Sequence, residues 1–514
     1  MKTPSADLFY LIKSLTRQEK RHLKIYASRH IIGGESKYMM LFDAIDKQKT
    51  YDESAIKKMY ANEAFIKQLT VMKAYLYDIV LKSLDAFTLG NSIDSQIRQL
   101  QHYVKILYDK ALYEQCEKVL LKAEKLAERH ERHSLMLDII DWKWKIIKTA
   151  YFHKTSEKEI DELYNSRQNI VSVLSNYNTY DWLNNKMLQK VLRKGWLTRS
   201  AEEIKKEYTP IINNKAYDSE SSPTSLRAKI LFNNTQSVYY YLKGDIEKSN
   251  IYSQKLLEIF DNHPEMIESN TDDYISGLNN LIYTSIRSGN YQEAGESIGK
   301  LKSINPISIG LKAKIVGAAY LPEMIIYNSS GRIDAAILLV PEIEKLISGN
   351  EKYMTQRDVL YLYYNCACIY FKTGDFRKTS HYLARILNST DIMLLPDVHA
   401  NARTLNLMVQ YELEEFEHLQ YMLRSTYRFL LKQERLYEFE KNVLGFIRKL
   451  TDVQGSGVLS LLRQLQDELM KLAKVNSYEK YAMEYFGFTD WLASKIQKVP
   501  IAEIMARSNQ QNWH

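Results

Sequence analysis

The segment Gly374-Asp-Phe-Arg-Lys-Thr379 contains the pattern that decides the fold. An apolar residue stands two positions after the glycine, and a small residue stands five positions after it. Glycine allows the unhindered turn that ends one helix, the next residue caps the following helix, and the apolar side chain begins its buried stripe. The pattern also occurs in three other segments, Gly244-Asp-Ile-Glu-Lys-Ser249, Gly289-Asn-Tyr-Gln-Glu-Ala294 and Gly331-Arg-Ile-Asp-Ala-Ala336.

These turns belong to a longer series with a nearly constant spacing. About 44 and 88 residues before Gly244, two capping boxes, Ser200-Ala-Glu-Glu203 and Ser156-Glu-Lys-Glu159, predict helix starts without a glycine. One more step back reaches Ala111, and one step forward reaches Glu414. The sequence therefore predicts about eight antiparallel helical hairpins, with a period of about 40 to 45 residues. Their turns are expected at positions 111, 155, 199, 244, 289, 331, 374 and 414.

The repeats resemble a known family. The segment Asn365-Cys-Ala-Cys-Ile-Tyr-Phe-Lys-Thr-Gly-Asp-Phe376 is similar to the Asn-Leu-Gly-x-x-Tyr and Gly-Asp-Tyr run of tetratricopeptide repeats, and residues 280–294 are similar too. That family repeats every ~34 residues, whereas armadillo and HEAT repeats, the structural alternative, have periods of about 40 to 47. The resemblance implies an all-α, right-handed α-solenoid over residues 91–430. Outside this register we expect an N-terminal helical module (1–90) and a C-terminal helical cap (431–514).

Composition favours long helices in a protein of the cytoplasm. Of 514 residues only 18 are glycine and 9 are proline, well below the roughly 7% and 5% of typical proteins. The net charge of +8 is mild and does not by itself indicate nucleic acid. Three cysteines do not form an even disulfide framework, and neither a signal peptide nor an apolar run of roughly 18 residues is present. We therefore expect a cytoplasmic protein without a membrane span.

The N-terminal module carries one basic helix face. Thr16-Arg-Gln-Glu19 is a capping box that opens a helix, Thr50-Tyr-Asp-Glu53 is expected to open a second, and residues 65–87 a third. Three short helices with exposed basic side chains are compatible with a helix-turn-helix DNA reader, and the alternative is a solvated helix face. The basic side chains stand at i, i+3, i+4 and i+7, and are Arg17, Lys20, Arg21 and Lys24.

Stacked hairpins expose an inner face built from the first helix of each pair, which suits an extended peptide or a partner helix. The resemblance places Asn280 and Asn365 at the inner-helix asparagine that contacts a bound peptide in the family. Six tyrosines could add flat contact surface, or could simply pack between helices: Tyr239, Tyr240, Tyr241, Tyr283, Tyr363 and Tyr364. The predicted function is a non-catalytic protein- or peptide-binding scaffold. The alternative is a transcription regulator whose N-terminal module binds DNA while the repeats sense a peptide or protein.

Candidate motifs for chemistry have the wrong spacing. His130-Glu-Arg-His133 has its histidines three apart instead of the four of the zinc-protease motif. Gly295-Glu-Ser-Ile-Gly-Lys300 has three residues between its glycines instead of four, and it lacks the following Ser or Thr of a phosphate loop. Cys366 and Cys368 do not have the spacing of a redox pair and are expected in the core. We predict no metal, no cofactor and no enzymatic activity.

The C-terminal cap is expected to contain three helices. Residues 436–450 and 459–475 are predicted helices joined through Gly455-Ser-Gly457. The aromatic segment 485–496 is predicted to hold a final helix with Thr489 as its N-cap. Its aromatic side chains either close the last hydrophobic repeat or, if exposed, form a docking site.

Overall fold

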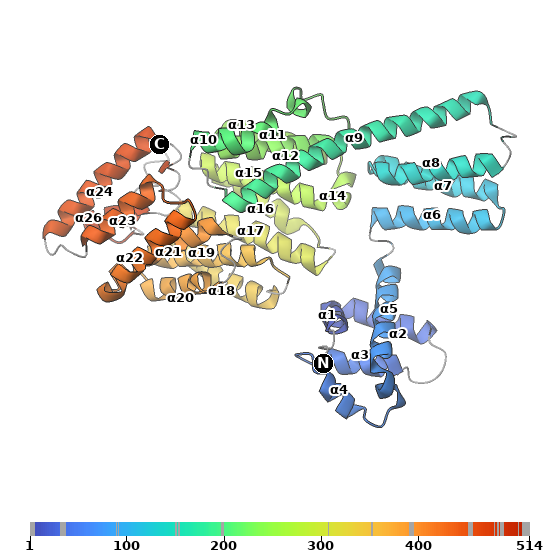
Figure 1. Ribbon diagram of the computed structural model, residues 1–514, viewed down its shortest axis with the longest axis horizontal. Coiled ribbons are helices and arrows are strands. Elements are labelled where there is room, and N and C mark those ends of the chain that lie inside the picture. The colour runs from blue at the N-terminus through green and yellow to red at the C-terminus, as the bar shows by residue number, and fades with distance from the viewer. Residues whose placement is uncertain are drawn as a thin grey trace. The chain divides into compact units, whose positions relative to one another are not determined.

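The computed structural model describes residues 6–30, 37–88, 90, 92–149, 152, 155–196, 200–306, 308–350, 353–389, 395–450, 456–476, 479–480, 483, 488–501 and 503–505. Every regular element in these ranges is a helix (Figure 1), which confirms the predicted all-α class. Within the same ranges, every helix is too short or too polar to cross a bilayer. The chain divides into two compact units, Met1–Ile170 and Val171–His514, so the predicted division at 90/91 and 430/431 stays a prediction.

The first unit begins with a helical module around its own apolar core. Ile12, Leu41 and Leu76 are completely buried where α1, α3 and α5 meet. Helices α1 and α3 were missed by the sequence analysis, because no capping box precedes them; Ala6, for example, makes no side-chain bond at the start of α1. The elements are α1 (Asp7–Ser14), α2 (Arg17–His30), α3 (Lys37–Lys47), α4 (Glu53–Met59), η1 (Ala64–Gln68) and α5 (Leu69–Thr88).

The two predicted capping boxes of this module differ in outcome. The Thr16 box is confirmed: Glu19 Oε2 accepts the Thr16 amide at 2.6 Å, and Thr16 Oγ1 accepts the Glu19 amide at 3.2 Å. The Thr50 box is wrong. Asp52 caps α4 instead, since its carboxylate accepts the Ala55 amide at 3.0 Å. A carboxylate one residue before the helix is a stronger acceptor than a hydroxyl three residues before it.

Three further helices, α6 (Ile93–Asp109), α7 (Tyr113–Arg129) and α8 (His133–Thr149), pack in sequence, α6 on α7 and α7 on α8. Ala111 forms the predicted turn between α6 and α7 with a left-handed φ of 59°. The capping box at Ser156 is confirmed by the bonds between the Glu159 amide and Ser156 Oγ (3.3 Å) and between the Ser156 amide and Glu159 Oε2 (2.7 Å).

Helix α9 (Glu157–Lys194) departs from the predicted hairpins. The turns expected at 155 and 199 require two helices between them, but α9 is a single helix of 38 residues that belongs to both compact units. Residues 157–194 contain neither glycine nor proline, so no residue in this stretch favours a helix end. Residue 199 lies outside the described residues. Gly195, with φ 85°, ends α9 four positions before it.

The second unit consists of helical hairpins in which a first helix is followed by an antiparallel second helix (Figure 1). After α9 come the short elements α10 (Ala201–Glu203), η2 (Ile204–Tyr208), α11 (Thr209–Ile212) and η3 (Lys215–Tyr217). The hairpins are α12 (Leu226–Lys243) with α13 (Ile246–Asn262), α15 (Thr271–Ser288) with α16 (Tyr291–Ser303), α17 (Ile309–Ser329) with α18 (Ile333–Asn350), α19 (Gln356–Lys372) with α20 (Phe376–Leu387), α21 (Pro396–Glu412) with α22 (Phe416–Lys432), and α23 (Glu438–Leu450) with α24 (Ser456–Val475). Helix α14 (Glu265–Ser269) precedes α15, and α26 (Phe488–Gln497) follows the hairpins.

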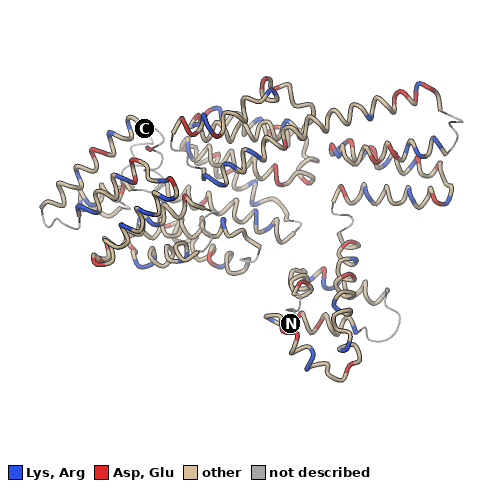
Figure 2. The backbone as a smooth tube through the Cα atoms, in the orientation of Figure 1, with Lys and Arg blue, Asp and Glu red and all other residues tan. Residues whose placement is uncertain are grey.

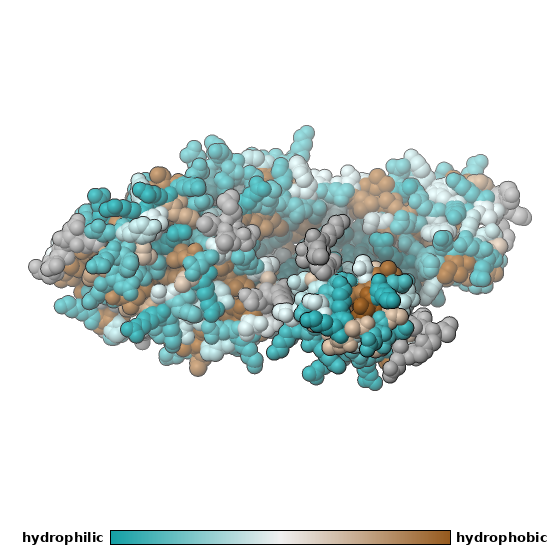
Figure 3. Space-filling model, turned by 60° about the horizontal axis from the view of Figure 1, so that its bottom comes forward, coloured by the Kyte–Doolittle hydropathy of each residue, from teal (hydrophilic) through white to brown (hydrophobic). Residues whose placement is uncertain are grey.

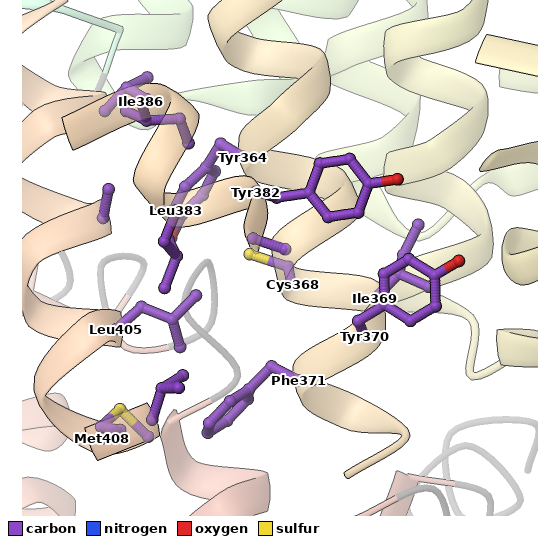
Figure 4. Close-up of a cluster of buried hydrophobic side chains, with 14 of the residues drawn as sticks. Tyr364, Cys368, Ile369, Tyr370, Phe371, Tyr382, Leu383, Ile386, Leu405 and Met408 are labelled. Atoms are coloured by element: carbon purple, nitrogen blue, oxygen red, sulfur yellow. The ribbon is translucent and has the colours of Figure 1, made fainter. Parts of the chain in front are cut away.

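Successive hairpins pack on one another. The first helices α12, α15, α17, α19, α21 and α23 contact each other in that order, and each second helix from α13 to α22 also contacts the first helix that follows it. Figure 4 shows the apolar core of one such junction, where Phe371 of α19, Leu383 of α20 and Met408 of α21 point toward one another. All three are 1% exposed or less.

Left-handed residues form the turns within the five hairpins from α12 to α22, as the sequence pattern predicts. In the turn between α21 and α22, Glu414 adopts the left-handed conformation with φ 60° although it has a side chain. The four glycines have φ between 71° and 84°, a region that residues with a Cβ enter at a cost, and are Gly244, Gly289, Gly331 and Gly374.

The last helix closes the end of the second unit. Phe488 and Trp491 are 0% and 1% exposed, so the described aromatic residues cover the core and do not form an exposed docking patch. Trp491 Nε1 donates to Glu412 Oε1 at 2.6 Å, which ties α26 to α21. The predicted N-cap is wrong, because α26 begins at Phe488 and Thr489 lies inside it. Gly455 and residues 484–487 lie outside the described residues.

Gly277 provides a close approach between α13 and α15, where a Cβ would lie 2.3 Å from Leu256 Cδ2. Because the core cannot hold the extra methyl group, we expect Gly277→Ala to destabilise the second unit by about 1–3 kcal/mol in urea denaturation. The matched control is Gly299→Ala on α16, where nothing lies within 4 Å of the added Cβ. It should stabilise by about 0.5–1 kcal/mol, and equal effects of the two changes would contradict the close packing.

Glu53 joins α4 to α5 and makes the stability of the first unit depend on pH. Burial raises the pKa of Glu53, but hydrogen bonds with Lys57, Lys73 and Tyr51 outweigh burial and hold that pKa at about 2, below its usual 4.5. The stabilisation is therefore present above about pH 4.5 and is lost as pH falls toward 2. Between pH 6 and pH 3, wild type should lose more unfolding free energy in urea than Glu53→Gln. An equal loss in both proteins would rule out this role.

Candidate functional site

A row of hydrogen-bonded asparagines joins the helices α9, α12 and α15. Asn234 on α12 donates its Nδ2 to Asn184 Oδ1 on α9 at 2.9 Å and accepts a bond from Asn280 Nδ2 on α15 at 2.7 Å. Asn184 and Asn234 are both 6% exposed, so these bonds form largely away from water. Since a buried amide without a partner is costly, the row fixes how the three helices lie along one another.

Basic side chains make a second kind of link between neighbouring first helices. Arg287 near the end of α15 donates Nη1 to the carbonyl oxygen of Tyr241 near the end of α12 at 2.9 Å. Lys372 at the end of α19 donates Nζ to the carbonyl oxygen of Asn328 on α17 at 3.2 Å. The last turn of a helix leaves carbonyls without intrahelical partners, and positive charge there is favourable. Each link thus stabilises a helix end and holds two hairpins together.

Aromatic and charged side chains from the end of α9 and from several first helices come together in the second unit. Trp196, directly after α9, packs edge-on against Tyr241 with ring centroids 6.2 Å apart. Tyr361 on α19 donates its hydroxyl to Asp397 Oδ2 on α21 at 3.1 Å, and Arg357 lies 5.6 Å from the Tyr361 ring centroid. We call the following residues the inner ring: Trp196, Tyr241, Tyr283, Arg287, Arg357, Tyr361 and Asp397.

The inner ring is surrounded by protein yet remains partly accessible. All of its members keep intermediate exposure. Burial raises the pKa of Tyr283, and the nearby Tyr241 adds to this rise while Arg357 opposes it. Burial and the Asp397 carboxylate raise the pKa of Tyr361 well above its ordinary value. Both phenols are therefore protonated at neutral pH and can donate hydrogen bonds, next to two guanidinium groups and a carboxylate.

The structure divides the predicted partner-binding residues into two groups. Asn280 and Tyr283 on α15 are partly exposed, although the Asn280 amide already bonds to Asn234. Tyr239, Tyr364 and Asn365 are 7%, 1% and 3% exposed. These three side chains lie in the core and not on an accessible surface. For Tyr239 and Tyr364, this is the alternative in which the tyrosines pack between helices.

The sequence analysis missed most of the inner ring. Arg287 stands four residues after Tyr283 and therefore on the same helix face, so this neighbour could have been found from spacing alone. Arg357 stands four residues before Tyr361 and so lies on the same helix face as that tyrosine. Asp397 could not have been found in this way, because only the packing of α21 on α19 brings it to Tyr361.

The predicted basic face of the N-terminal module is partly neutralised. Lys20 and Lys24 pair with two aspartates of α3 at 2.6 and 3.0 Å, whereas Arg17 and Arg21 are exposed. Figure 2 shows basic and acidic residues interspersed along the helices. Since binding to phosphates depends on uncompensated positive charge, the ion pairs weaken this face. A contact between it and DNA stays a prediction.

The motifs whose spacing does not match a catalytic or metal-binding site lie inside helices or at helix ends. Gly295 and Gly299 lie inside α16, and His130 is buried at the end of α7. Cys366 and Cys368 are 0% and 4% exposed, which confirms their predicted place in the core. Within the described ranges, no three metal-ligating side chains cluster together.

Comparison with known proteins finds no family model and no curated protein that matches this chain. Candidate functional residues of the second unit are therefore chosen from contacts, exposure and charge. The inner ring combines all three.

The asparagine row can be tested by removing its central member. Asn234→Ala removes the acceptor of the Asn280 amide and one of the two donors to Asn184 Oδ1, which keeps the Thr235 hydroxyl at 3.1 Å. We therefore expect the second unit to lose about 1–3 kcal/mol of stability in urea denaturation. Asn185→Ala is the matched control, because Asn185 is the exposed neighbour of Asn184 on the same helix. We expect little change there, and a similar loss in both variants would show that the row contributes nothing specific.

Proposed function

We propose that the second unit is a tetratricopeptide-like solenoid that binds an extended segment of a partner protein along its inner helices. The observation that carries this proposal is the inner ring, whose side chains come from the end of α9 and from four first helices and remain accessible. Stacked first helices offer a continuous surface to a chain that runs across them. This arrangement suits an extended peptide better than a compact small molecule.

The chemistry of the inner ring matches that of a peptide backbone. Every non-proline residue of an extended segment presents one amide donor and one carbonyl acceptor that need partners. The protonated Tyr283 phenol can donate to a carbonyl, Arg357 can bond a carbonyl or a carboxylate, and Asp397 can accept from an amide. Trp196 and Tyr241 add flat apolar surface, and such aromatic and arginine side chains commonly dominate binding energy.

A binding role is also favoured over catalysis by the residue types present. The members of the inner ring are tryptophan, tyrosine, arginine and aspartate, without the serine, cysteine or histidine that most often forms a nucleophile and base pair. On the face drawn in Figure 3, hydrophobic residues lie in small groups between hydrophilic ones.

Site-specific photo-crosslinking in cells tests the proposal. A photoreactive phenylalanine analogue at Tyr283 should form adducts with a partner segment, because this side chain faces the proposed path of the peptide. The same analogue at Tyr421, a 76% exposed tyrosine on the second helix α22, is the matched control. Adducts at Tyr421 but none at Tyr283 would place the binding surface elsewhere.

A substitution provides the corresponding affinity measurement. Tyr283→Ala removes a hydrogen-bond donor and a flat contact, so we expect at least tenfold weaker binding of the crosslinked partner segment, made as a synthetic peptide. Tyr421→Ala should bind that peptide as wild type does. Unchanged affinity in Tyr283→Ala would contradict a contact at this side chain.

A further inference from the structure

The two ends of the hairpin series in the second unit are joined by contacts between distant segments. In a stack of helical repeats each repeat normally contacts only its neighbours. Here Arg435, in the turn between α22 and α23, donates Nη2 to the carbonyl oxygen of Lys194, 241 positions earlier. Lys194 is the last residue of α9, where a carbonyl lacks an intrahelical partner. A guanidinium group therefore caps α9 from the far end of the series.

A second contact lies next to the first. Gly195 adopts φ 85°, and a Cβ at this position would lie 2.6 Å from Oδ2 and 2.9 Å from Cγ of Asp397. The backbone thus approaches this carboxylate more closely than any residue with a side chain would allow. Asp397 is itself held by the Tyr361 hydroxyl, so the contact connects the end of α9 to α21 and, through it, to α19.

The segment after α9 is attached firmly to α9. Glu207 on η2 bonds to Lys190 and Lys194 at 2.7 and 3.1 Å. Tyr208, the last residue of η2, is 1% exposed. The end of α9, which Arg435 caps, and η2 are therefore held together.

We infer that Gly195, Asp397 and Arg435 form a clasp that closes the inner ring, and that the ring opens at this clasp to admit a partner segment. The clasp consists of one hydrogen bond from the partly exposed Arg435 and of the approach of the partly exposed Asp397 to the buried Gly195. Neighbouring hairpins are instead joined by buried apolar side chains such as Phe371 and Met408. The clasp is therefore the joint that separates most easily. Opening at the clasp follows from these contacts alone. The identity of the occupant, an unfolded chain segment and not a folded domain, rests on the proposed function.

Hydrogen exchange of the full chain, without any partner, tests the clasp. Arg435→Ala removes the cap on α9, and Gly195→Ala pushes a methyl group into the Asp397 carboxylate. Both should raise amide exchange in residues 200–208 and 395–403 at least tenfold and leave α15 and α16 unchanged. The matched controls are Arg428→Ala, an exposed arginine on α22, and Gly289→Ala, which has φ 80° but nothing within 4 Å of an added Cβ.

These variants decide between two results. Exchange at the wild-type rate in both segments of Arg435→Ala would overturn the clasp. Because Arg435 is a partly exposed turn residue, its replacement is a mild change. Arg435→Ala is therefore the decisive variant if Gly195→Ala does not fold. Exchange that rises equally in Gly195→Ala and Gly289→Ala would also overturn it, because backbone strain alone would then explain the effect.

The rate at which a thiol in the inner ring is modified tests whether the clasp controls access to that ring. Tyr283→Cys places a thiol in the inner ring, while the three native cysteines are all buried. We expect a maleimide to modify this thiol at least fivefold faster when Arg435→Ala is added, and at an unchanged rate when Arg428→Ala is added. Equal rates in all three proteins would mean that the inner ring is open without any movement at the clasp.

Discussion

The contact between successive first helices is the constraint on which the second unit depends. A single hairpin cannot bury its apolar surface, so each first helix must pack against the helices before and after it. This packing requires a chain reversal within a few residues, which left-handed residues provide in the five hairpins from α12 to α22. It also brings side chains from different hairpins into contact, and the inner ring is a product of those contacts.

Apolar and polar contacts have different roles in this arrangement. Apolar side chains such as Leu383 and Met408 fill the junctions between hairpins, but apolar packing alone tolerates small sliding movements. The asparagine row and the bond from Arg287 to the Tyr241 carbonyl are directional, so a shift of one helix along another would break them. The polar contacts therefore specify one alignment of the inner helices, and the inner ring needs that alignment.

Local features of the fold could be predicted from the sequence, whereas features that depend on distant contacts could not. Gly244, Gly289, Gly331 and Gly374 act within one turn, so their pattern located the hairpins correctly. The continuity of α9 was missed because the spacing of capping boxes says where helices begin but not whether one ends between them. The burial of Tyr364 and the contact of Arg435 with Lys194 depend on which helix lies opposite, and that information is spread over the whole unit.

Ala111 and Glu414 adopt the left-handed turn with φ 59° and 60° although both have side chains. Packing on either side of these turns must therefore offset the steric cost, which is about 1–2 kcal/mol for such a residue. Once neighbouring helices impose the reversal, the glycine that first suggests a repeat is no longer required. A search for the glycine pattern alone would therefore pass over these two turns, which backbone conformation reveals directly.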